Sequence, residues 1–220
     1  MNINKTLSAL SIASMSLMLG ATSTFADAIP YPTTGVENPV TYTFTATTSG
    51  HIIAYYAGST ASYENQLGML INGTLSPSGY GLDNQLSLPL GTAFDLGAVS
   101  IGDSLVFVLH NVSPYGINAY SDPSLNGPYD GGTAHNHVYS TPYTQTSPII
   151  DSIPSGTYVS FEDLAAFASP DWNYHDENFV FSNVSVVASP DAASTLLLLA
   201  GGFGIIALAR SRFLGRTLAV

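Results

Sequence analysis

Residues 40–45 read Val-Thr-Tyr-Thr-Phe-Thr, so that apolar or aromatic side chains alternate with threonines. A period of two places alternate side chains on opposite faces of a β-strand, and Thr, Tyr and Phe favour a pleated surface. The stretch therefore predicts a half-buried strand that continues to Ala46.

Further candidate strands follow at short spacing, separated by clusters of Gly, Pro, Ser and Asn; they are residues 51–57, 65–72, 104–111, 156–161 and 178–187. Asn72-Gly73 is a strong hairpin signal. The span 114–148, rich in Tyr, Pro, Gly and Asn, is expected to be the longest loop region. Because the middle of the chain lacks a sustained helical period, we expect an all-β domain, a β-sandwich or jelly roll, over residues 29–188.

Charge is divided sharply along the 220-residue chain, whose net charge is −11. The basic residues are Lys5, Arg210, Arg212 and Arg216, and every one of the 15 acidic residues lies between Asp27 and Asp191. A middle domain without Lys or Arg cannot neutralise phosphates, which excludes nucleic acid as a partner. There is no cysteine, so disulfides and thiolate metal sites are excluded. Unscreened carboxylates favour an external cation, although solubility alone also explains acidic charge.

The first 26 residues follow the pattern of a secretory signal peptide. Lys5 gives a positive start, residues 7–21 are apolar, and small residues permit cleavage after Ala26 or Ala28, of which we favour Ala26. The alternative is an uncleaved anchor, although the apolar run is short for a membrane span.

A second targeting segment occupies residues 189–220. Residues 192–209 carry no charge and predict a transmembrane helix, and the basic tail 210–220 that follows is expected to stay in the cytoplasm. Together with the signal peptide, this places the middle domain outside the cytoplasmic membrane. A buried core helix is the alternative.

The order of a Pro-acid motif, an apolar helix and a terminal Arg cluster resembles a PEP-CTERM sorting signal. The motif here is Pro190-Asp191-Ala192, similar to the VPD-type variant, and Arg210 and Arg212 begin the cluster. The resemblance implies recognition by an exosortase after signal peptidase has acted, with a transient anchor in the cytoplasmic membrane and delivery to the cell surface or extracellular matrix of a Gram-negative-type bacterium.

The densest group of candidate ligands is Asp163, Asp171, Asn173 and Asp176. Calcium prefers several carboxylate and amide oxygens, and no neighbouring Lys or Arg would neutralise these groups. The loop lacks the glycine and glutamate of an EF-hand. The alternative is that Asp171, Asn173 and Asp176 form Asx turns before the last strand.

Residues 161–164, Phe-Glu-Asp-Leu, and the segment 171–181 are also similar to uncharacterised outer domains found ahead of PEP-CTERM signals. That resemblance implies a β-sandwich with a calcium-linked or purely structural role.

Other chemistry is less well supported. His110, His135 and His137, with Asp130, could hold zinc or copper, but solvated histidines explain them as well. Glu162 and Asp163 are expected on opposite faces of a strand, which disfavours a glycosidase pair. The leading prediction is therefore a non-enzymatic, candidate calcium-binding surface protein. One alternative is a carbohydrate-binding adhesive module with exopolysaccharide as partner. It is suggested by the loop tyrosines Tyr115, Tyr120, Tyr129, Tyr139 and Tyr143. The other alternative is a secreted hydrolase that uses Asp163, Asp171 or Asp176.

Overall fold

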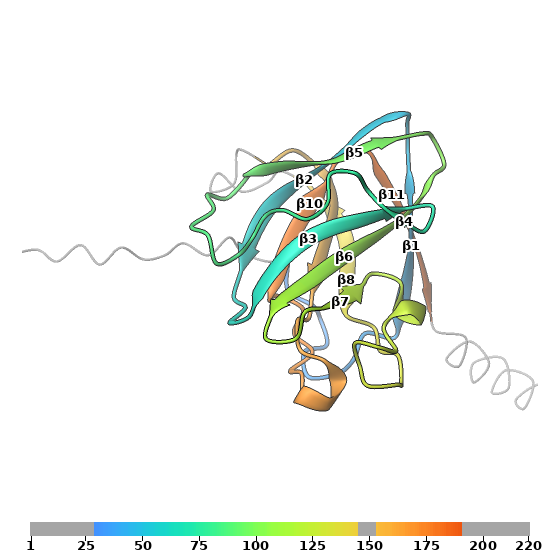
Figure 1. Ribbon diagram of the computed structural model, residues 1–220. Coiled ribbons are helices and arrows are strands. Elements are labelled where there is room, and N and C mark those ends of the chain that lie inside the picture. Colours follow the sequence, from blue (N-terminus) through green and yellow to red (C-terminus); the bar gives the residue numbers. More distant parts are fainter. Residues whose placement is uncertain (1–28, 145–152, 191–220) are drawn as a thin grey trace, which may run out of the picture.

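A computed structural model describes residues 29–144 and 153–190 of the chain. The described part is all-β: two antiparallel sheets lie face to face in a β-sandwich-like fold (Figure 1). Its only helical turns are two short 3₁₀ segments, η1 (Pro123–Leu125) and η3 (Ala166–Ala168). The all-β prediction is therefore confirmed for this part.

The first sheet has the strand order β11-β1-β6-β3-β4, and β7 pairs with β6 beside that path. Its strands are β1 (Val40–Ala46), β3 (Glu64–Ile71), β4 (Thr74–Leu75), β6 (Ser104–Ser113), β7 (Ile117–Tyr120) and β11 (Val184–Pro190). Tyr42, Phe44 and Ala46 of β1 are buried, as the alternation predicts.

The second sheet has the order β5-β2-β10-β9-β8. Its strands are β2 (Gly50–Ser59), β5 (Ala93–Val99), β8 (Val138–Tyr143), β9 (Gly156–Phe161) and β10 (Glu177–Phe181). All five residues of β10 are buried, because this strand lies in the centre of its sheet.

Aromatic rings join the two sheets. Phe107 of β6 stacks on Phe181 of β10 with ring centroids 3.8 Å apart, and Phe44 of β1 meets Phe107 edge-on at 5.1 Å. All three side chains are almost fully buried, so this contact forms the middle of the core.

The predicted strand 178–187 is wrong as a single element, because the chain crosses from one sheet to the other within it. β10 ends at Phe181 and β11 begins at Val184. Asn183 adopts a left-handed conformation with φ of 61°, and its side-chain oxygen accepts hydrogen bonds from Thr47 and Thr48. Asn tolerates this conformation better than most residues do, so Asn183 forms the turn that separates β10 from β11.

The span 114–148 is not one loop in its described part. It contains β7, η1 and β8. Strand β5, which lies outside this span, was not predicted, because apolar and polar residues alternate only weakly there.

The predicted signal peptide and transmembrane helix lie outside the described residues. Within residues 29–144 and 153–190, no helix is long and apolar enough to span a membrane. Pro190, the first residue of the predicted sorting motif, pairs with Val40 as the last residue of edge strand β11.

We expect Phe181→Ala to lower the free energy of unfolding by about 3–5 kcal/mol, because it removes a fully buried ring from the contact between the sheets. Urea unfolding of the purified protein measures this. Val187→Ala on β11, where the side chain is 62% exposed, is the control and should change stability by less than about 0.5 kcal/mol. Similar losses from both variants would contradict this view of the core.

Candidate metal centre

The pairing of β9 with β10 brings acidic residues from separate parts of the chain together. Phe161, the last residue of β9, pairs with Glu177, the first residue of β10. Because the strands are antiparallel, the residues that follow β9 and the residue that precedes β10 lie at the same end of this strand pair. Glu162 and Asp163 therefore meet Asp176.

These three residues form what we call the acidic centre. One carboxylate oxygen from each of Glu162, Asp163 and Asp176 lies within 4.8 Å of the other two. Glu162 is 0% exposed and Asp163 is 4% exposed. Oxygen atoms at this spacing could bind a metal ion, and hard cations prefer such ligands.

Backbone and side-chain donors fix the geometry of the acidic centre. The Asp163 N–H donates to Asp176 Oδ2 at 3.0 Å, and the Leu164 N–H donates to Glu162 Oε1 at 3.2 Å. Asn65 Nδ2 donates to Asp163 Oδ2 at 2.8 Å. Since Asn65 belongs to β3 of the opposite sheet, the acidic centre lies where the two sheets meet.

A fourth buried carboxyl group, that of Glu177, adjoins the acidic centre and accepts a hydrogen bond from Ser59 Oγ at 3.0 Å. Three buried oxygens have no hydrogen-bond partner among the described residues: Glu162 Oε2, Glu177 Oε2 and Asn65 Oδ1. Unpartnered buried acceptors are costly, so a proton or a cation is needed there.

The electrostatics agree with this need. Burial, reinforced by the charge of Asp176, raises the pKa of Glu162 to about 9 and that of Asp163 to about 7. Burial also raises the pKa values of Asp176 and Glu177. Each shift means that the folded protein disfavours the bare carboxylates.

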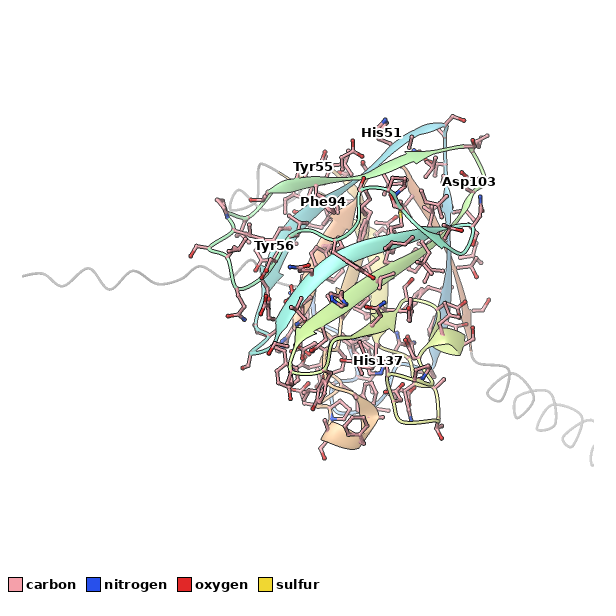
Figure 2. All side chains as sticks on the ribbon, in the orientation of Figure 1. His51, Tyr55, Tyr56, Phe94, Asp103 and His137 are labelled. Carbon is pink, nitrogen blue, oxygen red and sulfur yellow. The ribbon has the colours of Figure 1, made fainter. Side chains whose placement is uncertain are left out.

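The nearby His137 does not neutralise the acidic centre, because its ring is engaged elsewhere. His137 Nε2 lies 2.9 Å from Asp130 Oδ1 with both side chains fully buried, and Nδ1 lies 3.1 Å from the backbone oxygen of Glu162. Burial opposes the ionisation of Asp130, but hydrogen bonds from His137 and two backbone N–H groups outweigh it and lower the pKa of Asp130. Figure 2 places His137 at the end of the sandwich opposite His51 and Asp103.

The four sequence-predicted ligands separate into two pairs. Asp163 and Asp176 belong to the acidic centre. Asp171 instead accepts hydrogen bonds from the backbone and side-chain N–H groups of Asn173, and Asn173 Oδ1 accepts from the His175 N–H. These are the contacts of Asx turns, and Asp171 is exposed.

The three candidate histidines have separate partners. His110 bonds to Asn118 at 2.7 Å, His135 to Glu37 at 2.9 Å and His137 to Asp130. The described residues place no three of these groups at metal-ligand spacing.

The expectation that Glu162 and Asp163 point to opposite faces is wrong. Both residues lie beyond the last residue of β9, where strand alternation no longer applies, and the turning backbone directs both carboxylates to Asp176. The sequence feature that could have identified Glu162 as a ligand is the pair of adjacent acidic residues, Glu162-Asp163, directly after an apolar strand.

Comparisons with protein-family models, curated proteins and solved structures find no match for this chain. The geometry of its own residues is therefore the basis for assigning a function.

The raised pKa values predict that the metal-free protein loses stability as the pH rises. A carboxyl group whose pKa is higher in the folded state stabilises the fold fully below its unfolded pKa, and this contribution is lost as the pH rises towards the folded value, about 9 for Glu162. With a chelator present, we expect Tm to fall by about 5 °C or more between pH 5.5 and pH 9.

Glu162→Gln should flatten that pH dependence, because the buried amide does not titrate. Asp103→Asn is the control: the pKa of exposed Asp103 is lowered by hydrogen bonds from Asn72 and Ser100, so it titrates below this pH window. A Tm of the metal-free protein that is constant or rises between pH 5.5 and pH 9 would refute the prediction.

Proposed function

We propose that this chain is an exported, non-enzymatic surface protein whose outer domain folds around a calcium ion at the acidic centre. The observation that carries the proposal is that buried Glu162 and Asp163 and half-buried Asp176 lie within 4.8 Å of one another in a chain with no Lys or Arg between Lys5 and Arg210. With no Lys or Arg to pair with these groups, an external cation is the natural counter-charge.

The ligand chemistry favours calcium over zinc or copper. All candidate ligand atoms are carboxylate oxygens, one each from Glu162, Asp163 and Asp176. Calcium accepts six to eight such ligands in flexible geometry, whereas zinc and copper prefer histidine or cysteine. Sites of this kind in extracellular domains bind calcium at about 10⁻⁴–10⁻³ M.

Burial argues against a hydrolase at the same residues. The carboxyl pair of a glycosidase must flank a sugar bond, yet Glu162 is 0% exposed and Asp163 is 4% exposed. Asp171 is exposed but held in a turn with Asn173. A cation that stabilises the domain is therefore the better explanation of these acids.

Export and sorting rest on the sequence, and the end of the fold is compatible with them. β11 is an edge strand that ends at Pro190, where the motif Pro190-Asp191-Ala192 begins. A proline suits the end of an edge strand, where a missing N–H is tolerated. An exosortase that recognises this motif would act at the end of edge strand β11.

Calcium should raise Tm by about 5–10 °C at pH 8 when present at about 100 times its Kd, because binding to the folded state alone stabilises it by about 2.7 kcal/mol. Differential scanning calorimetry with calcium or with chelator measures the gain. Asp176→Asn should abolish the gain, whereas Asp171→Asn, outside the acidic centre, should retain it. An unchanged Tm in about 100 mM calcium, which is about 100 times the weakest Kd expected here, would refute the calcium site.

A tag within the outer domain should be recovered from the cell surface or medium of an exosortase-containing host. A chain that stops after Pro190 keeps every described strand, so it should still be exported but should lose surface attachment. Fractionation followed by immunoblotting distinguishes these outcomes. Cytoplasmic recovery of the full chain would contradict export.

A further inference from the structure

The outer face of the first sheet carries a hollow of about 550 Å³. Leu67, Met69, Phe107, Leu109 and Ala119 point into the core, so the alternate residues of the same strands point outward; they are Gly68 and Leu70 of β3, Val108 and His110 of β6, and Asn118 and Tyr120 of β7. The hollow has the size of a typical small-molecule site.

Two stacked rings line this hollow. The Cδ1–Cε1 edge of the Tyr80 ring points at Gly68, where a Cβ atom would come within 2.6 Å of both ring carbons. Tyr80 also stacks on His110, with ring centroids 4.6 Å apart and an angle of 21° between the planes. Gly68 thus makes room for a ring that any larger residue would displace.

Hydrogen bonds from Asn118 link the polar side chains of the hollow. Asn118 Nδ2 donates to the hydroxyl oxygens of Tyr80 at 3.2 Å and Tyr120 at 3.1 Å, and Asn118 Oδ1 accepts from His110 Nδ1 at 2.7 Å. Both amide hydrogens are then used. Each tyrosine hydroxyl keeps its own hydrogen for another acceptor, and in the tautomer that carries its proton on Nδ1, Nε2 of His110 is an acceptor.

The hollow is uncharged although the domain around it is acidic. None of the residues that line it is Asp, Glu, Lys or Arg. An anionic ligand would find no basic partner here and would be repelled by the surrounding carboxylates. A cationic ligand would find no carboxylate at contact distance in the lining.

We propose that this hollow, which we call the tyrosine hollow and define by Tyr80, His110, Asn118 and Tyr120, binds a neutral saccharide. The C–H face of a pyranose ring packs on an aromatic plane, and sugar hydroxyls both donate and accept, which matches two O–H donors and one imidazole acceptor. The tyrosine hollow shares none of these four residues with the acidic centre, so the inference does not depend on calcium binding.

The test is a glycan array followed by isothermal titration calorimetry on the full exported domain, in calcium and in chelator. The probes are neutral hexasaccharides of glucose, galactose and mannose, with oligogalacturonate as the acidic comparison. We expect saturable binding of at least one neutral hexasaccharide and weaker or no binding of oligogalacturonate.

Variants assign the binding to the tyrosine hollow. Tyr80→Phe keeps the ring but removes its hydroxyl, and it should weaken binding about fivefold, as expected for one hydrogen bond. Gly68→Val should displace the ring and abolish binding, with circular dichroism to verify the fold. Tyr55→Phe on β2 of the other sheet is the matched control and should bind normally.

Three results would overturn the proposal: no binding of any neutral hexasaccharide, preference for oligogalacturonate, or equal binding by wild type, Tyr80→Phe and Gly68→Val. If calcium fails to raise Tm while neutral glycans still bind, the calcium site alone is refuted.

Discussion

The burial of three carboxyl groups and the partial burial of a fourth, without a Lys or Arg beside them, is the constraint on which this structure depends. Glu162, Asp163, Asp176 and Glu177 collect at one end of the β9–β10 pair. Carboxylate charges this close together and this far from water repel one another, so some of these groups must be protonated or a cation must join them. The domain contains no Lys or Arg, which leaves protons and external cations as the two choices.

This constraint joins local chemistry to the whole fold. The acidic centre lies between the sheets, because Asn65 reaches it from β3 while its carboxylates come from the ends of β9 and β10. A cation bound there would hold the two sheets together at that end, as the stack of Phe107 on Phe181 does in the middle. A domain built in this way gains stability only where the cation is available, which suits a chain expected to fold after export.

The sequence predicted the strands whose pattern is local, and it missed features that depend on distant partners. The alternation of residues 40–46 matches β1, and residues 156–161 match β9. By contrast, the break at Asn183 follows from hydrogen bonds with Thr47 and Thr48, residues that are far away in the sequence. Asp163 and Asp176 lie together as expected, but Glu162 joins them only because β9 ends one residue earlier, a boundary that alternation does not define. The tyrosine hollow combines Tyr80, His110 and Asn118 from separate parts of the chain, so no single stretch of sequence reveals it.

The acidic centre consists of carboxyl groups, whereas the tyrosine hollow has no Asp, Glu, Lys or Arg in its lining, yet one residue connects the two sites. Tyr129 lines the wall of the tyrosine hollow, and its hydroxyl donates to the backbone oxygen of Asp163 in the acidic centre. A cation that fixes Asp163 would also fix this hydroxyl and therefore the wall beside a bound sugar. Linkage is reciprocal, so a saccharide that contacts Tyr129 would raise the affinity for the cation by the same factor. Coupling between the two sites, if saccharide titrations in calcium and in chelator give different affinities, would run through the Tyr129 hydroxyl and the Asp163 backbone.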